Sequence, residues 1–141
     1  MNPNTLFYIL IAFIIIDFVV DKIIDHLNAK HFDDKVPDEL ADVYDEKEYL
    51  KSQAYKKENN KFSIYTSSFS IVVTLAFFLF KGFAWVDQIA RNITDNEIFV
   101  TLIFFGIIML ANDFISTPFS YYQTFVIEEK YGFNKSTKKL F

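Results

Sequence analysis

The chain has 141 residues, of which 52% are hydrophobic and 19% aromatic, and its formal net charge is −4. This composition excludes a disordered chain and a collagen-like repeat, and the lack of cysteine excludes disulfides, thiolate metal sites and a cysteine nucleophile. The negative charge argues against a nucleic-acid partner. The charged residues lie outside the long apolar runs, which is the pattern of a membrane protein.

The first apolar run lies close to the N-terminus. Eleven consecutive apolar residues from Leu6 to Ile16 are followed by more apolar residues up to Ile24. A membrane helix needs about 20 residues, so we predict a first span at 6–24. A cleaved signal peptide is the alternative, but residues 1–5 carry no Lys or Arg and no small-residue cleavage site follows. We therefore expect an uncleaved membrane helix.

Two further spans follow in the sequence. Residues 62–80 carry no charge, and we predict the second span at 62–83. Hydroxyl side chains gather in its first half, which favours contact with protein or water there. The third span is predicted at 98–117, and Pro118 is expected to loosen or kink that helix. Trp85 lies just beyond the second span, where aromatic anchors are enriched.

The distribution of basic residues predicts the orientation. Lys22, the loop 25–61 and the tail 118–141 together hold twelve Lys residues, whereas the opposite side holds only Lys81 and Arg91. Cytoplasmic segments of membrane proteins are enriched in Lys and Arg. We therefore expect the N-terminus outside, and both the loop and the C-terminal tail in the cytoplasm.

The loop 25–61 contains a helix-start pattern, Pro37 followed by Asp38 and Glu39. Apolar residues at approximately helical spacing follow, so we predict a helical cytoplasmic loop. One interpretation is a solvated helix resting on the membrane face. The other is a docking surface for a substrate or a partner.

The tail 118–141 is too apolar for a free loop. We expect its first part, Phe119 to Ile127, to continue the third helix or to lie at the membrane interface. Gly132 follows two Glu and a Lys and can supply a helix-stop conformation, with a turn at 134–137. Because the sequence stops at Phe141, just after this turn and a basic cluster, we expect it to be the first part of a longer polypeptide.

Carboxylate and amide side chains occur inside two predicted spans. Asp17 and Asp21 share one helical face in the first span, and Asn112 and Asp113 lie in the third. A carboxylate at membrane depth costs roughly 3 kcal/mol on insertion scales and normally faces protein or a water-filled cavity. Asp21 lies near the span's end, where snorkelling into headgroups accounts for it. For Asp17 that interpretation and a hydrated chamber wall both stay open, and we select Asp17, Asn112 and Asp113 as candidate chamber-lining residues.

The sequence contains no complete catalytic or metal-binding motif. His26 and His31, the only histidines, are five residues apart and do not converge on one metal ion from a helix. H-E-x-x-H, G-x-S-x-G and glycine-rich phosphate loops are absent. The neighbours Glu128 and Glu129 lie on different helical faces and make a poor acid–base pair. We predict no catalytic, cofactor-binding or metal-ligating residue in this chain.

The segment 118–137 resembles the N-terminal membrane region of type I CAAX prenyl proteases, which are integral-membrane zinc endopeptidases. Its most specific part is residues 127–137, IEEKYGFNKST. This motif block includes Glu128, Glu129, Gly132, Phe133 and Asn134. A weaker similarity lies upstream, in Val36-Pro37 with Glu39-Leu40 and then in Tyr49, Lys51, Ser52 and Tyr55.

The resemblance implies an all-α membrane protein with three transmembrane helices and a helical cytoplasmic loop, as part of a seven-helix α-barrel around a hydrated chamber. In the family, two His of an H-E-x-x-H helix and a distant Glu hold zinc, far downstream of the matched region. No catalytic residue therefore carries over, and zinc is expected only in the full-length enzyme. The implied partners are the lipid bilayer, the remaining catalytic portion, and a peptide or membrane-protein substrate.

Three functional hypotheses follow from these observations. The first is the N-terminal membrane domain of a CAAX-type zinc endopeptidase, spanning residues 1–141, which forms chamber wall and cytoplasmic loop and is inactive by itself. The second is a non-catalytic small membrane subunit that binds a larger membrane complex. The third is a small transporter or proton-channel component that uses Asp17 and Asp113.

Overall fold

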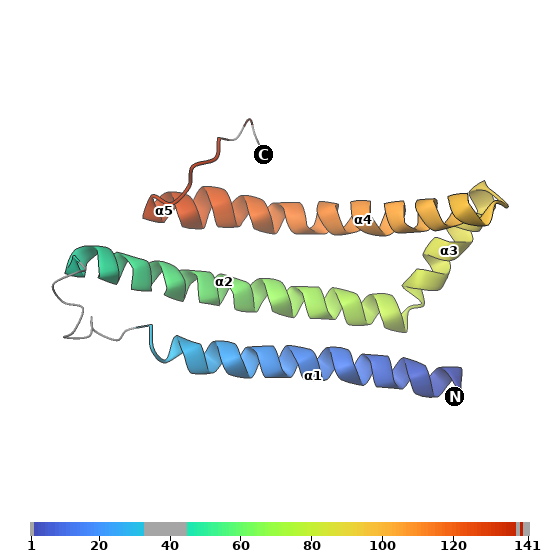
Figure 1. The fold of residues 1–141 in the computed structure, drawn as a ribbon, viewed down its shortest axis with the longest axis horizontal. Coiled ribbons are helices and arrows are strands. Elements are labelled where there is room, and N and C mark those ends of the chain that lie inside the picture. The colour runs from blue at the N-terminus through green and yellow to red at the C-terminus, as the bar shows by residue number, and fades with distance from the viewer. Residues whose placement is uncertain (1, 33–44, 138, 140–141) are drawn as a thin grey trace. The chain divides into compact units, whose positions relative to one another are not determined.

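The computed structural model describes residues 2–32, 45–137 and 139, and this part of the chain contains helices and no strand (Figure 1). The helix start predicted at Pro37 lies outside the described residues. Two compact units are formed, one from Met1–Ile71 with Tyr122–Phe141 and the other from Val72–Tyr121. The elements in chain order are α1 (Pro3–Ala29), α2 (Glu46–Leu79), α3 (Gly82–Ile93), α4 (Glu97–Tyr122), the π-helix η2 (Gln123–Glu128) and α5 (Glu129–Tyr131).

Helix α1 contains the whole of the first predicted span. Its N-terminus is capped by the Asn2 side chain, whose oxygen accepts a hydrogen bond from the Asn4 backbone N–H at 3.0 Å. Pro3 fits the first turn because a proline there loses no helical hydrogen bond. Near the other end, Lys22 and Asp25 form an ion pair of 2.6 Å.

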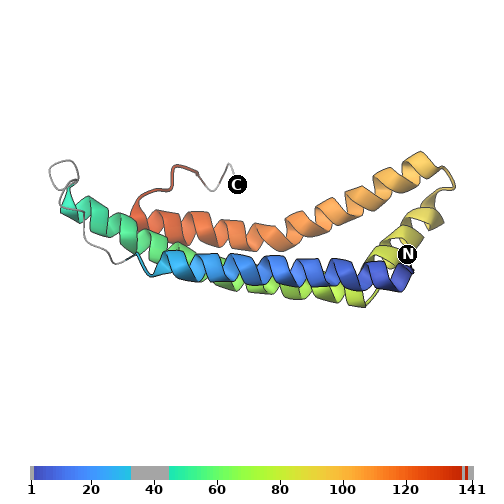
Figure 2. The same ribbon diagram turned by 60° about the horizontal axis from the view of Figure 1, so that its bottom comes forward.

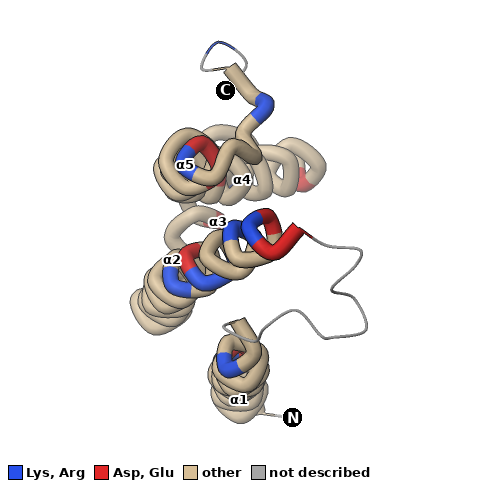
Figure 3. The backbone as a smooth tube through the Cα atoms, turned by 90° about the vertical axis from the view of Figure 1, so that its left-hand side faces the viewer, with Lys and Arg blue, Asp and Glu red and all other residues tan. Residues whose placement is uncertain are grey.

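Helix α2 runs for 34 residues without a break at the predicted loop–span boundary near residue 61. Its charged residues lie in the turns that follow Glu46, and its remaining turns are uncharged (Figure 3). At 1.5 Å per residue such a helix is about 51 Å long, well beyond a hydrocarbon core of about 30 Å. Such a helix is long enough to cross a bilayer and to carry its charged turns beyond it.

The end of α2 differs from the predicted span 62–83, since the helix stops at Leu79. Lys81 adopts a left-handed conformation with φ 59°, which breaks the helical path and starts α3. Gly82 then packs directly on Phe77, because a Cβ atom at this position would lie 2.4 Å from the Phe77 ring. The Phe83 ring contacts Phe77 and Phe78 edge-on at centroid distances of 4.8 and 4.9 Å.

Helix α4 continues through Pro118 and bends along its length (Figure 2). Proline cannot donate a backbone hydrogen bond and crowds the preceding turn. In that turn the Ser116 and Thr117 hydroxyls both donate to the Asp113 carbonyl, at 3.3 and 2.6 Å. The predicted continuation of the third helix into the tail is confirmed, because η2 and α5 follow α4 directly and reach Tyr131.

Two of the described helices are long and apolar enough to cross a membrane, Glu46–Leu79 and the continuous stretch Glu97–Tyr131. Their apolar turns are largely exposed in the isolated chain, as lipid-facing surfaces are. Helix α1 is not one of these two, so the membrane crossing at 6–24 stays a prediction.

Candidate functional site

The motif block packs against the charged part of α2. We call this contact region the α2–α5 junction and define it by residues from two segments of one compact unit. Its members are Lys51, Ala54, Tyr55, Glu58 and Asn59 of α2, together with Gln123, Lys130, Tyr131 and Phe133. All of them lie outside the predicted spans 62–83 and 98–117.

Glu58 is the polar centre of the α2–α5 junction. Its Oε2 atom accepts hydrogen bonds from the Lys130 ammonium at 2.6 Å and from the Tyr131 hydroxyl at 2.7 Å. These two donors lower the pKa of the Glu58 carboxyl below its usual value. The same bonds raise the pKa of Lys130 and that of Tyr131, because each proton is held by the carboxylate.

Aromatic rings surround this polar centre. Tyr55 contacts the Tyr131 ring edge-on at a centroid distance of 5.5 Å and the Phe133 ring at 4.7 Å. The Lys51 ammonium lies 5.6 Å from the centre of the Phe133 ring, within cation–π range. The Tyr131 hydroxyl also lies 3.3 Å from the Ala54 carbonyl oxygen, so it reaches the backbone of α2.

Gly132 ends the helix in the way the sequence predicts. It has φ +71°, the left-handed conformation that glycine adopts without a Cβ penalty. The chain then folds back, and the Phe133 backbone N–H donates to the Glu128 carbonyl at 2.9 Å. The Asn134 side chain donates to the Glu129 carboxylate at 2.7 Å, which fixes the turn that leaves α5.

The π-helix η2 carries the buried apolar contact of this region. Ile127 is only 1% exposed, whereas its neighbour Val126 is 41% exposed. At the start of η2, the Gln123 side chain donates a hydrogen bond to the Asn59 side chain. One turn of α2 further on, the Phe62 ring stacks on Tyr122 with a centroid distance of 5.1 Å. Together these contacts hold η2 along α2.

The contacts of the α2–α5 junction are structural: they hold the motif block against α2. The junction's central carboxylate, Glu58, accepts hydrogen bonds from both Lys130 and Tyr131. Among the described residues, no group of three or more His, Asp or Glu side chains lies close enough to hold a metal ion. The residues present therefore do not fit a zinc site, and His26 and His31 do not form one within the described part of the chain.

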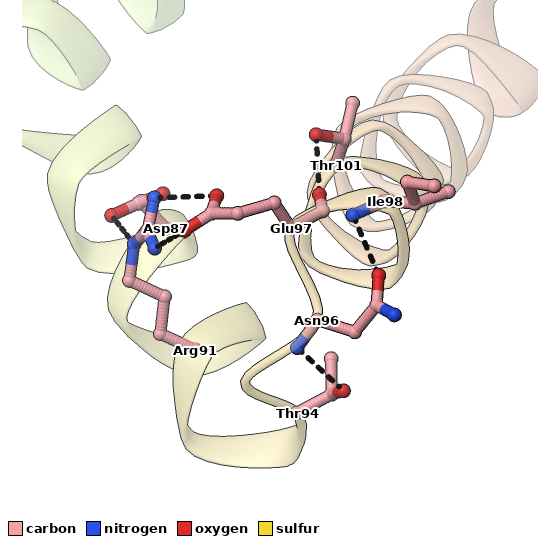
Figure 4. Close-up of polar contacts among 7 residues, drawn as sticks. All are labelled: Asp87, Arg91, Thr94, Asn96, Glu97, Ile98 and Thr101. Atoms are coloured by element: carbon pink, nitrogen blue, oxygen red, sulfur yellow. Dashed lines mark hydrogen bonds and ion pairs between the residues drawn. The ribbon is translucent and has the colours of Figure 1, made fainter.

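A second polar cluster lies where α3 turns into α4 (Figure 4). Arg91 pairs with Asp87 at 3.0 Å and with Glu97 at 2.9 Å, and these two carboxylates raise the pKa of its guanidinium. The Asn96 side chain caps α4 by accepting from the Ile98 backbone N–H at 3.0 Å. This cluster closes the α3–α4 turn.

The three candidate chamber-lining residues lie on two helices. Asp17 belongs to α1, and Asn112 and Asp113 belong to α4. All three side chains are exposed in the isolated chain. The Asp113 backbone carbonyl accepts a hydrogen bond from the Thr117 hydroxyl. Their role as chamber lining stays a prediction.

Sequence reasoning did not identify Glu58, Asn59 and Gln123. They pair across 64 to 73 positions of the chain, and no local pattern marks such partners. One signal was available, because Lys51 and Tyr55 belong to the upstream block of family similarity. In the structure these two residues contact Phe133 of the downstream block, so the two similar blocks meet.

Comparison with known proteins agrees with this arrangement. The sequence model described as "CAAX prenyl protease N-terminal, five membrane helices" matches residues 25–141. The probable CAAX prenyl protease 1 of Schizosaccharomyces pombe is 36% identical over 121 residues, covering 77% of this chain and 26% of that protein. The human CAAX prenyl protease 1 homolog is 30% identical over 113 residues, covering 75% and 24%. The chain thus spans about a quarter of the length of these curated relatives.

The fold also matches a solved structure. The crystal structure of S. mikatae Ste24p superposes with a TM-score of 0.86 at 28% sequence identity, covering 99% of this chain and 34% of that one. The described helices therefore have the fold of part of that protein.

Proposed function

Because this chain belongs to the CAAX prenyl protease family, as the match over residues 25–141 shows, we propose that it forms the N-terminal membrane portion of an integral-membrane zinc endopeptidase. The observation that carries this proposal is the contact between the motif block and α2, where both segments of family similarity meet at the α2–α5 junction. In this function the chain supplies chamber wall and a cytoplasmic helix, and it contributes no catalytic residue.

The seven-helix barrel and its hydrated chamber belong to this proposal. Asp17 and Asp113 are acidic residues within predicted spans and are exposed in the isolated chain, and carboxylates at membrane depth need water or a partner. Chamber walls would provide both. The remaining helices of the ring and the zinc ligands come, in this proposal, from the catalytic portion, since the described residues offer no zinc site.

The proposed substrate is a prenylated CAAX peptide or a membrane protein, by analogy with the name of the family. A chimera tests this role: residues 25–141 replace the matched region of the Saccharomyces cerevisiae CAAX prenyl protease 1, a relative that is 29% identical over 116 residues. Cleavage of a farnesylated CAAX peptide by membranes that hold the chimera is the expected result. The control is the same chimera with the glutamate of its H-E-x-x-H replaced by Gln, which must be inactive.

A chimera that reaches the membrane and folds, yet cleaves nothing, would contradict the proposal. The alternative is a non-catalytic subunit of a larger complex. The mass of the native polypeptide, measured in its own membranes, distinguishes this subunit from the protease. A native mass of 16.6 kDa with an inactive chimera would favour the subunit. A larger native mass and an active chimera support the protease.

We also propose that the charged turns of α2 and the tail after α5 face the cytoplasm, with the α3–α4 turn on the opposite side. The Lys residues of 25–61 and of the tail support this orientation. Residues 1–141 contain no cysteine, so the increase in labelling over the unmutated protein reports the introduced site in each single-cysteine variant. In sealed vesicles whose cytoplasmic face is inside, Asn92→Cys should react with a membrane-impermeant maleimide. Glu48→Cys should react only after the vesicles are permeabilised. Equal reactivity of both sites in sealed vesicles would overturn the orientation.

A further inference from the structure

Helix α3 has one apolar face that the rest of its unit leaves uncovered. Trp85, Ile89 and Ile93 recur every four residues and therefore lie along one side of the helix. Trp85 and Ile93 are each 64% exposed. We call these three residues the α3 stripe.

A different face of α3 holds the helix in place. Val86 is 2% exposed and Ala90 is fully buried, and at the start of the helix the Phe83 ring also stacks on Phe104 of α4 at 6.4 Å. The packing of α3 on its neighbours thus uses residues other than the α3 stripe. Trp85 and Ile93 thus stay exposed at the surface of this unit.

The polar side of α3 is nearly neutral. Its one cation, Arg91, is paired with Asp87 on the same helix and with Glu97 at the start of α4. The other polar residues of this side, Gln88 and Asn92, carry no charge. A helix with paired charges on one side and an apolar stripe on the other can lie in a membrane interface without bringing an unpaired charge toward the lipid.

The position of α3 in the chain selects lipid as the occupant. It directly follows one of the two helices that can cross a membrane and directly precedes the other. Only Phe80 and Lys81 connect α2 to α3, and only residues 94–96 connect α3 to α4. Because these connections are so short, a bilayer that α2 and α4 both cross would have α3 at its surface.

Exposed apolar residues also flank α3 in the chain on both sides. Leu79 and Phe80 at the end of α2, and Ile98 in the first turn of α4, are among the most exposed apolar residues. We propose that α3 is a monotopic membrane-interface helix whose α3 stripe binds the acyl-chain boundary of the leaflet, with Trp85 at headgroup level. This proposal rests on the chain being a membrane protein, and it stands or falls independently of proteolytic activity.

Trp85 provides the test, because it is the only tryptophan of the sequence. The protein is reconstituted into phosphatidylcholine vesicles brominated near the headgroup, at mid-chain or at the chain end. Bromine quenches nearby indole fluorescence. Trp85 should lose most intensity with bromine near the headgroup, least with bromine at the chain end, and little with aqueous acrylamide. The difference between wild-type and Trp85→Phe signals isolates Trp85 from any other tryptophan that a longer polypeptide carries.

A second variant calibrates depth. Met109 is 67% exposed and lies 12 residues after Glu97 on α4, about 18 Å along the helix axis, which is near the centre of the bilayer core. The double variant Trp85→Phe, Met109→Trp should lose most intensity with bromine at the chain end. This reporter on α4 shows whether the protein is inserted in the bilayer, independently of the position of α3.

Three outcomes at Trp85 overturn the proposal once the Met109→Trp reporter shows insertion. Quenching by acrylamide alone places α3 in water. Protection from both acrylamide and every brominated lipid means that another part of the protein or a second copy covers the α3 stripe. Strongest quenching by chain-end bromine places α3 within the bilayer core. Each of these results leaves the chimera test of protease function unaffected.

Discussion

The Tyr131 hydroxyl lies 2.7 Å from Oε2 of Glu58, a residue 73 positions earlier in the chain. Lys130 donates to the same oxygen at 2.6 Å. One carboxylate therefore ties the end of the α4–η2–α5 helix to α2, and its removal is the most direct way to loosen the motif block.

Glu58→Gln should lower the melting temperature of the detergent-solubilised protein and remove part of its pH dependence. The folded protein lowers the pKa of Glu58 from its ordinary 4.5, so this stabilisation is fully present above that value and is lost as the pH falls through the lower folded pKa. The pKa of Lys130 is raised by its hydrogen bond with Glu58. The stabilisation from this ammonium is therefore fully present below the ordinary lysine pKa and is lost as the pH rises through the higher folded pKa. Thermal unfolding at pH 6 and at pH 3 measures the effect.

Tyr131→Phe is the matched control for that series. It removes the hydroxyl that donates to Glu58 and reaches the Ala54 carbonyl, a loss of about 1 kcal/mol, but keeps the ring contact with Tyr55 and the Lys130 ion pair. Its melting temperature should fall slightly, with the acid sensitivity retained. Equal stability of wild type and Glu58→Gln at pH 6 would show that the ion pair contributes nothing.

Gly132→Val should reduce the yield of folded protein. A side chain at φ +71° costs about 1–2 kcal/mol, and a β-branched one costs more. Gly132→Asn should be tolerated better, because asparagine adopts the left-handed conformation more readily. Gly106→Ala is the control, since nothing lies within 4 Å of the position where its Cβ would be. Size-exclusion chromatography of the solubilised protein gives the folded fraction.

Ile127→Ala should destabilise the protein by about 2–5 kcal/mol, as loss of a buried aliphatic side chain does. Ile127 is 1% exposed within η2. Val126→Ala, next to it but 41% exposed, should change the melting temperature far less. Equal stability of the two variants would contradict the inference that Ile127 is buried and stabilises this region.

Asn96→Ala should cost about 1 kcal/mol by removing the cap of α4. The Asn96 side chain accepts from the Ile98 backbone N–H, and an aspartate can do the same. Asn96→Asp should therefore restore stability, and the favourable interaction of a carboxylate with a helix N-terminus supports this. Chemical or thermal unfolding compares the three proteins, and a loss in Asn96→Asp equal to that in Asn96→Ala would refute the capping role.

Replacing both His26 and His31 with Ala should leave the zinc content of the native protein unchanged. Neither belongs to a group of metal-binding side chains within the described residues, and the family resemblance places the zinc ligands downstream. Zinc is measured by atomic emission on purified protein. Loss of zinc in the double variant would assign a metal site to this chain after all.

Local patterns predicted the three long helices and the helix stop at Gly132, because apolar runs and glycine conformation act over a limited stretch of sequence. Helix α2 ends four residues before the predicted end of the second span, because Lys81 adopts a left-handed conformation that has no sequence signature. Helix α3 was not predicted, although Phe83, Val86 and Ala90 recur at helical spacing. That amphipathic pattern is the signal that could have revealed it.

The contacts of the candidate site depend on tertiary structure and could not be predicted in the same way. The residue pair Glu58 and Lys130 looks, in sequence, like two ordinary surface charges. Their pairing depends on how far α4 continues past Pro118 and on the π-helix that follows it. No local motif predicts the length of that continuation or the change from α-helical to π-helical hydrogen bonding within it.

The π-helix changes which side chains share a face. Tyr122 and Tyr131 are nine residues apart, and in an uninterrupted α-helix they would point in directions about 180° apart. Both nevertheless contact α2, Tyr122 through Phe62 and Tyr131 through Tyr55. The wider turns of η2 rotate Tyr131 back toward the side that Tyr122 occupies. The angular offset built into these six residues is thus what allows one helix to contact another at two successive levels.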